Sequence, residues 1–229
     1  MKLAKPVSHL IFALLLPMCA IARDIYTHPQ VGAGVSGLRG TTLGNPASRG
    51  GIATCVGINA GIRLGNFRTG LGLSVLNSSY HNDDIFMESS VDPSTGQFVQ
   101  KMYDLTYSFT QVLLMLNAGY EIGADSKVSI TPEISIGPGY NAIIKSRMLS
   151  QETGEETKTK NMSNGFNSIP IYGRLAVHFT YRVNDRLGIT LAPVYSHELN
   201  GSFSPIKTSI LTPPGLYAIT GNIGVMLNL

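Results

Sequence analysis

The stretch VSITPEISIGPGYNA, residues 128–142, decides the fold class of this chain. Every second residue, from Val128 through Pro132 to Ala142, is apolar or proline. The residues between them are small or polar, and Glu133 is the one charged residue among them. Side chains along a β-strand point alternately to opposite faces, so this period of two predicts a strand with one apolar face. The stretch is also longer than the roughly 9–11 residues that a tilted strand needs to cross a bilayer.

The same alternation continues on both sides of this stretch, from about residue 30 to the end of the chain. No segment shows a helical spacing of apolar residues over a useful length. The pattern predicts eight strands, at residues 30–39, 52–64, 68–80, 105–123, 128–144, 169–183, 187–199 and 216–229. An all-β fold follows, because strands this long and this regular leave no room for a helical layer.

The connections between these strands alternate between short and long. The short ones lie around residues 66–67, 124–127 and 184–186, and the long ones at 40–51, 81–104, 145–168 and 200–215. Tight turns on one rim and long loops on the other are typical of outer-membrane barrels, whose short turns face the periplasm. The sequence therefore predicts an eight-stranded antiparallel up-and-down transmembrane β-barrel with long extracellular loops.

The two faces of the strands indicate which side meets lipid. The apolar faces carry the large side chains, whereas the other faces are mostly Gly, Ser, Thr, Asn and Ala, which suit a narrow lumen. A soluble lipocalin-like barrel, the alternative, needs a charged outer face. Because backbone edges cannot stay open in hydrocarbon, the sheet is expected to close. The expected interface aromatics are Tyr120, Tyr140, Phe179, Tyr181, Tyr195 and Tyr217.

The first 22 residues have the pattern of a cleaved secretory signal peptide. Lys2 and Lys5 precede a short apolar run, and Ala20-Ile21-Ala22 is a small-x-small cleavage signature. We expect cleavage after Ala22, a barrel domain at residues 23–229, and localisation in the bacterial outer membrane. Cys55 is then the one cysteine of the mature chain, which excludes an internal disulfide.

Two strands also carry a family resemblance. SITPEISIGPGY at residues 129–140 and YGRLAVHFTYRVNDR at residues 172–186 resemble small outer-membrane β-barrel domains of the PorT-like kind, which are related to OmpA-like and opacity-type barrels. The resemblance covers nearly the whole mature chain and implies an eight-stranded barrel with no catalytic residues to carry over. It also implies the barrel-insertion machinery as a partner, although such barrels commonly end in an aromatic residue and this chain ends in Leu229.

Several motifs suggest chemistry but lack its structural context. The G-x-G-x-x-G spelling at residues 32–37 opens no helix, so Gly32 and Gly34 are expected to be small lumen residues. In the Ser196-His197-Glu198 triplet, His197 falls on the lipid-facing phase, which disfavours a catalytic relay with His81, Asp83 or Asp84. The histidines have no metal-ligand spacing. We expect no enzyme activity, cofactor or metal; an outer-membrane lipid-modifying enzyme of the lipid A deacylase kind stays the alternative.

The inward phase collects charges that need partners in an enclosed lumen. The expected lumen network consists of Arg63, Glu121, Glu133, Arg174, His178 and Arg182. Glu133 is expected to pair with an arginine, with Arg174 the first choice and Arg182 or Arg63 the second. Local bulges are expected at Pro132 and Pro193, because proline lacks a ladder donor. The aromatic residues 103–109, out of phase with Val112, indicate a further irregularity.

The composition narrows the function. Charged residues make up only 14% of the chain and its net charge is +3, which gives no electrostatic case for nucleic acid. Eight strands leave an interior just wide enough for side chains, so a nutrient porin is disfavoured. We expect a structural or surface-interaction role, with outer-membrane lipid around the barrel and an unknown surface partner at loops 81–104 and 145–168.

Overall fold

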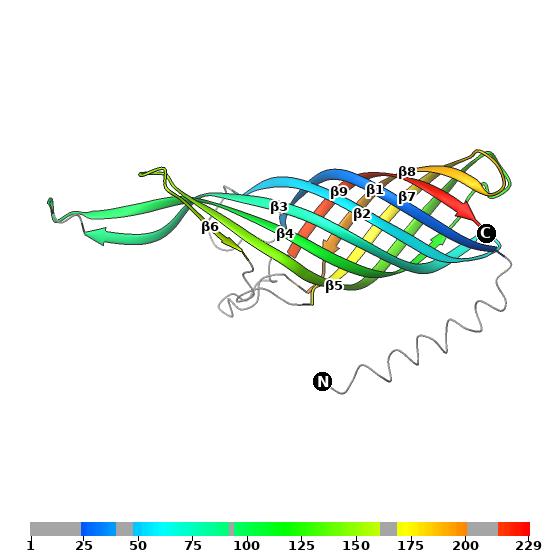
Figure 1. Ribbon diagram of the computed structural model, residues 1–229, viewed down its shortest axis with the longest axis horizontal. Coiled ribbons are helices and arrows are strands. Elements are labelled where there is room, and N and C mark those ends of the chain that lie inside the picture. The colour runs from blue at the N-terminus through cyan, green and yellow to red at the C-terminus, as the bar shows by residue number, and fades with distance from the viewer. Residues whose placement is uncertain (1–23, 40–47, 92–93, 161–168, 201–214) are drawn as a thin grey trace, which may run out of the picture.

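The computed structural model describes residues 24–39, 48–91, 94–160, 169–200 and 215–229 (Figure 1). Nine strands make up this part of the chain: β1 (Asp24–Arg39), β2 (Ser48–Leu64), β3 (Phe67–Val91), β4 (Phe98–Tyr120), β5 (Val128–Ser150), β6 (Glu156–Lys160), β7 (Ile171–Arg182), β8 (Leu187–Glu198) and β9 (Gly215–Asn228). Among the described residues, no helix is long and apolar enough to span a membrane. The predicted leader and its cleavage point lie outside the described residues.

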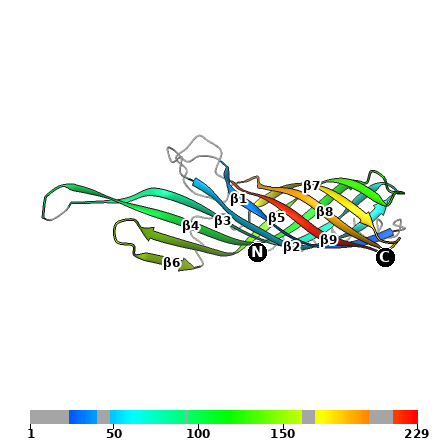
Figure 2. The same cartoon turned by 90° about the horizontal axis from the view of Figure 1, so that it is seen from above.

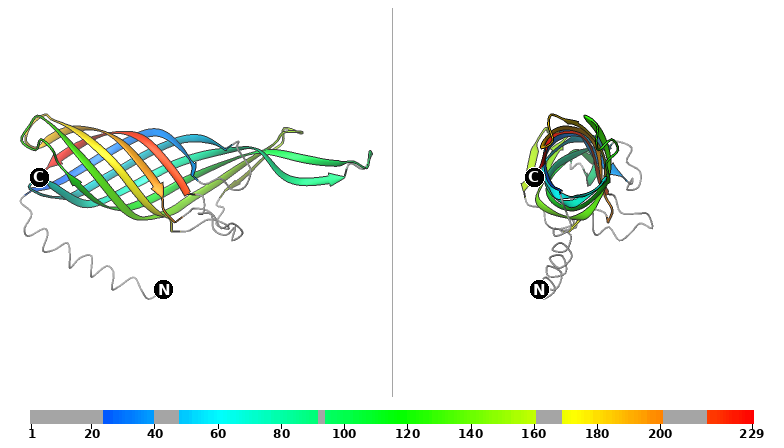
Figure 3. Two further views of the ribbon diagram at one scale, coloured as in Figure 1. Left: turned by 180° about the vertical axis from the view of Figure 1, so that it is seen from behind. Right: turned by 90° about the vertical axis from the view of Figure 1, so that its right-hand side faces the viewer.

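Eight of these strands close into a barrel. The sheet runs β4-β3-β2-β1-β9-β8-β7-β5, and pairing of β4 with β5 completes the ring, which is seen along its axis in Figure 3. Every pairing is antiparallel, and each strand lies beside its neighbours in the sequence except at the seam, where β1 meets β9. The predicted eight-stranded up-and-down barrel is confirmed. β6 lies outside the ring and pairs with the far end of β5.

The strands are strongly tilted. A row of paired residues that starts at Gly119 in β4 can be followed once around the ring and returns to β4 at Phe109. The row passes through Glu133, Ala176, Val194, Thr220, Gly34, Ala53 and Ser78. The row therefore returns ten residues further along the strand. This stagger in eight strands corresponds to a tilt of about 40° from the barrel axis, inside the usual range for barrels.

The two faces of the wall divide as the alternation predicts. In β5 and β7, the outward Ile134 and Leu175 are 60% and 56% exposed, whereas the inward Ser135 and Ala176 are 2% and 5% exposed. The outward Tyr120, Tyr140, Phe179 and Tyr181 are about half exposed, and Tyr195 and Tyr217 are partly exposed. An apolar outer belt would be unstable in water, so the soluble lipocalin-like alternative is wrong and the belt faces hydrocarbon.

Two of the three sequence expectations about irregularities are wrong. The ladders of β5 and β8 keep one register through Pro132 and Pro193, so neither proline forms a bulge. The third expectation, an irregularity between Phe109 and Val112, is confirmed, because the β4–β5 pairing shifts its register between Thr110 and Gln111, opposite Ala142. The alternation in β4 is unbroken: the large side chains at 105–109 change phase relative to Val112 because Phe109 points into the lumen, where it is 1% exposed.

The two central long connections are mostly paired strands and not loops. The β3–β4 pairing extends to Val91 opposite Phe98, and the β5–β6 pairing runs from Lys145 opposite Lys160 to Leu149 opposite Glu156. Since β4 also pairs with β5 as far as Ser150, these strands form one open sheet above the rim, which we call the raised sheet. It projects along the barrel axis well beyond the other strands (Figures 1 and 2).

Closure of the ring gives a first expected result. Protein folded in detergent and left unboiled should migrate differently on a gel from boiled protein, because a closed ladder without open edges resists unfolding by detergent. The measurement is gel mobility before and after boiling. Identical mobility of the two samples would contradict a closed barrel.

Candidate functional site: the layered lumen

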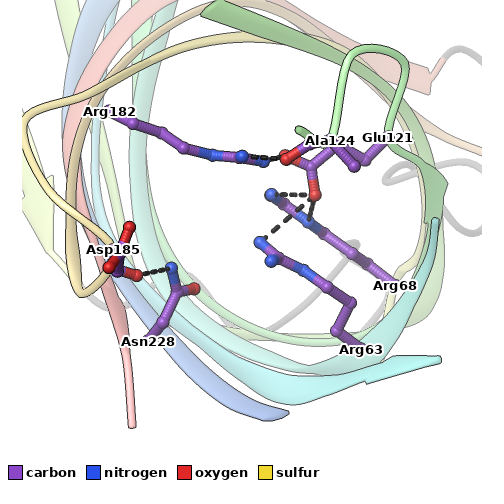
Figure 4. A network of polar contacts seen from close by, with 7 residues as sticks. All are labelled: Arg63, Arg68, Glu121, Ala124, Arg182, Asp185 and Asn228. Carbon is purple, nitrogen blue, oxygen red and sulfur yellow. Dashed lines mark hydrogen bonds and ion pairs between the residues drawn. The ribbon is translucent and has the colours of Figure 1, made fainter. Parts of the chain in front are cut away.

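The end of the lumen that carries the short turns is filled by one carboxylate and three arginines (Figure 4). Glu121, whose side chain is fully buried, places Oε2 2.5 Å from Arg68 Nη2 and 3.2 Å from Arg63 Nη2. Its Oε1 lies 2.5 Å from Arg182 Nη2, and Arg182 also donates to the carbonyl of Ala124. We call these four charged residues the rim cluster.

Tight turns bring the rim cluster together. Arg63 and Arg68 face each other across the β2–β3 turn, where Gly65 adopts a φ of 63° that favours glycine. Glu121 begins the β4–β5 turn and Arg182 ends β7. Because the four side chains point inward from β2, β3, β7 and the β4–β5 turn, the cluster crosslinks the wall of the barrel across its lumen.

A second polar layer lies above the rim cluster. His178 Nε2 is 3.6 Å from Glu133 Oε2, and Ser135 donates to the other carboxylate oxygen at 3.3 Å. The His28 ring meets the His178 ring edge to face at 5.2 Å, and its Nε2 lies 2.6 Å from Thr190 Oγ1. The layer thus joins β1, β5, β7 and β8.

The expected pairing of Glu133 with an arginine is wrong. Within the described part of the chain, the basic side chain that contacts the Glu133 carboxylate is His178, and Arg182 and Arg63 bind Glu121 instead. Arg174, the first choice, donates to Ser196 Oγ and Ser74 Oγ, each at 3.2 Å. Glu133 lies opposite Ala176, so Arg174 and His178 are both its diagonal neighbours across the β5–β7 pairing. The Arg174 guanidinium binds the hydroxyl groups of β8 and β3 instead.

Apolar side chains close the rest of the lumen. A cluster that includes Cys55, Leu113 and Met115 packs beside Arg174, and the Tyr172 hydroxyl donates to Gln111 Oε1 at 2.7 Å. Nearer the raised sheet, the rings of Tyr80, Tyr107 and Phe109 stack nearly parallel, with centroids 5.2–6.4 Å apart. The lumen of the described barrel is therefore packed with side chains, as expected for eight strands.

The other motifs take the places that their phase predicts. Gly32 and Gly34 face the lumen, where a Cβ on Gly34 would collide with the Ile219 carbonyl of the neighbouring strand. Ser196 and Glu198 point inward and are buried, whereas His197 lies on the outer phase. The side chains of Asp83 and Asp84 lie outside the described residues. Among those described, no group of three or more His, Cys, Asp or Glu residues could hold a metal ion.

Two important lumen residues are absent from the predicted network. Arg68 lies 2.5 Å from Glu121, as close as Arg182. The alternation in β3 predicts that it faces inward, because even-numbered residues of this strand, such as Ser74, are buried. His28 lies before residue 30, where the strand was expected to start, although β1 begins at Asp24. All six predicted residues do face the lumen, where they divide into the rim cluster, the Glu133–His178 pair and Arg174.

Comparisons with known proteins add likeness of fold. No protein-family model matches this chain, and no curated protein sequence matches it. Neisserial surface protein A is 13% identical, with 89% of this chain and 96% of that chain covered and a TM-score of 0.39. The attachment invasion locus protein Ail of Yersinia pestis is 11% identical, with 89% of this chain and 98% of that chain covered and a TM-score of 0.41. A major outer membrane protein from Thermus thermophilus is 12% identical, with 90% of this chain and 99% of that chain covered and a TM-score of 0.46.

The assignment of the chain to a membrane follows from its own geometry. The ring has no open edge at the level of the belt, the belt is apolar, and the charges lie paired in the lumen. These are the properties of barrels that span the bacterial outer membrane. The chain is an eight-stranded β-barrel of the outer-membrane class.

Proposed function

We propose that this barrel is a surface-interaction protein that holds the raised sheet outside the cell, with the short turns in the periplasm. The observation that carries the proposal is the pairing of β3, β4, β5 and β6 beyond the rim. Paired strands present a defined surface to a partner at a lower entropic cost than a mobile loop of the same length. The packed lumen supports this reading, because it leaves transport as the less suitable role.

The β5–β6 hairpin has the character of a surface for polar partners. Glu156 Oε1 lies 2.5 Å from Arg147 Nε and 3.1 Å from Lys158 Nζ, and all three side chains are solvent-accessible. The Lys158 ammonium and the Arg147 guanidinium lower the pKa of the Glu156 carboxyl. We therefore place the partner contact at residues 81–104 and 145–168.

Within the outer-membrane class, we propose that the chain is one of the small PorT-like barrels. The residue pattern of β5 and β7 supports this membership.

A photo-crosslinking amino acid at the tip of the β5–β6 hairpin tests this role. Glu152, in the exposed turn between β5 and β6, is replaced by the crosslinker, and intact cells are irradiated. We expect crosslinks to molecules outside the cell, because this turn projects furthest on its hairpin.

The matched control places the same crosslinker at Asp125, in the exposed β4–β5 turn on the opposite rim. It should reach periplasmic components alone. Exterior crosslinks from Asp125 but not from Glu152 would mean that the barrel is inserted the other way up, and an absence of exterior crosslinks from both would contradict the interaction role.

A further inference from the structure

A groove of about 660 Å³ crosses the outer face of the barrel over β4, β5, β7 and β8. Its centre line is the backbone of the paired, inward-pointing residues Gly119, Glu133, Ala176 and Val194. The low bank begins at Tyr120 and continues with the shorter side chains Pro132, Val177 and Pro193. The high bank begins at Ala118 and continues with the longer side chains Ile134, Leu175 and Tyr195.

The groove has the length of one acyl chain. It begins at Phe67 in β3 and ends at Ile219 in β9, five interstrand spacings of about 4.8 Å or roughly 24 Å. Because the strands tilt by about 40°, a paired row climbs at the same angle from the membrane plane, so the groove rises roughly 15 Å. Half of a bilayer core about 30 Å thick is also about 15 Å.

The position of the groove selects a leaflet. Phe67 directly follows the β2–β3 turn, so the groove starts at the short-turn rim, and the row paired with Phe67 climbs to Gly221 of β9, roughly 15 Å higher. Its lower end carries polar groups at the level of the headgroups, where the Asn66 amide donates to the Tyr120 hydroxyl at 3.4 Å. The leaflet on the periplasmic side of an outer membrane consists of phospholipid.

The groove also gives a role to two prolines that weaken the hydrogen bonding between the strands. Pro132 and Pro193 each remove a hydrogen-bond donor in mid-strand, yet neither bends its strand or shifts its register. Both instead keep the low bank of the groove low, on either side of Val177. A row of large apolar residues at these positions, like the opposite bank, would fill the groove.

We propose that this groove holds one acyl chain of a phospholipid from the periplasmic leaflet as a bound lipid that outlasts exchange with its neighbours. The proposal rests on the orientation given under Proposed function. The groove is continuous with the lipid-facing belt, its exposed lining is apolar, and its volume lies within the roughly 300–1,000 Å³ of sites that take small ligands. Each methylene held in the groove gains contacts that a flat wall would not provide.

Native mass spectrometry of the full barrel in mixed micelles of detergent and phosphatidylglycerol tests the site. We expect one phospholipid to stay bound to each barrel after the detergent is removed. The variant Val177→Phe raises the low bank and should reduce this retention about tenfold, the effect of losing contact with roughly two methylene groups. The control Val56→Phe, on the outer face of β2, should retain the lipid.

Gel mobility before and after boiling verifies that both variants are folded. Equal retention by the Val177→Phe variant and the parent barrel would overturn the proposal, and so would an equal loss of lipid from the Val56→Phe control. Retention of lipopolysaccharide in place of phospholipid in a competition sample would overturn the leaflet assignment. None of these results affects the crosslinking test of the raised sheet, so the two proposals fail separately.

Discussion

Replacing Glu121 with glutamine should lower the free energy of unfolding by about 3–5 kcal/mol, which is the cost of breaking a buried ion pair on one side. Glu121 is fully buried and is the shared acceptor of Arg63, Arg68 and Arg182. Its neutralisation leaves three guanidinium groups facing one another in a narrow lumen. The measurement is urea unfolding of the barrel in lipid vesicles, followed by gel mobility without boiling.

A matched substitution separates burial from charge. Glu156→Gln removes a carboxylate that also contacts two cations but lies in the exposed β5–β6 hairpin, and it should leave the unfolding midpoint unchanged. Exchanging Glu121 and Arg68 together for leucine and methionine should recover part of the lost stability, because one of the three guanidinium groups that Glu121 leaves stranded is then removed as well. Equal, small effects of Glu121→Gln and Glu156→Gln would show that water solvates the rim cluster.

Two neighbouring leucines in β4 should respond to truncation very differently. Leu113 points into the lumen and is fully buried, whereas Leu114 points to the belt and is 48% exposed. Leu113→Ala should cost about 2–5 kcal/mol, because the packed lumen cannot collapse into the space left behind. Leu114→Ala should cost far less, because acyl chains flow into the gap and restore the contacts.

The same vesicle unfolding measurement checks this pair, and the two variants share chemistry, strand and depth. The difference between the two losses of stability therefore shows which face of the barrel wall packs against other side chains and which face meets lipid. A larger loss for Leu114→Ala than for Leu113→Ala would mean that the belt packs against another protein, and it would contradict a wall that faces lipid.

The sequence predicts the inward face of each strand well, since a period of two fixes which side chains share a face. Arg174, His178 and Arg182 are therefore all expected inside, and all are found there. Partner choice depends on register, which a period does not specify. The connection between β5 and β7 is too long to fix this register from the sequence. In the structure Glu133 lies opposite Ala176, with Arg174 and His178 as its two diagonal neighbours, and Arg174 binds hydroxyl groups of β3 and β8 instead.

The sequence pattern does not predict the strands of the raised sheet, for a related reason. Residues 81–104 and 145–160 show no sustained alternation of apolar and polar residues, because their apolar residues occur in short runs such as Ile85-Phe86-Met87 and Met148-Leu149. Without a contrast between faces, the period of two disappears from the sequence although the strands are present. Hydrogen bonds between neighbouring backbones, continued from the barrel below, hold them in place.

The β1–β9 seam sets the order in which this molecule can be assembled. It joins the two ends of the barrel chain: Asn222 donates to Gln30 across 192 residues, and the amide of the last residue, Leu229, donates to the Ile25 carbonyl. All other pairings in the ring are made between strands that follow each other closely, so their entropic cost of closure is smaller. The seam therefore forms last, and until it does, β1 and β9 expose two unsatisfied edges that must be kept from pairing with other chains.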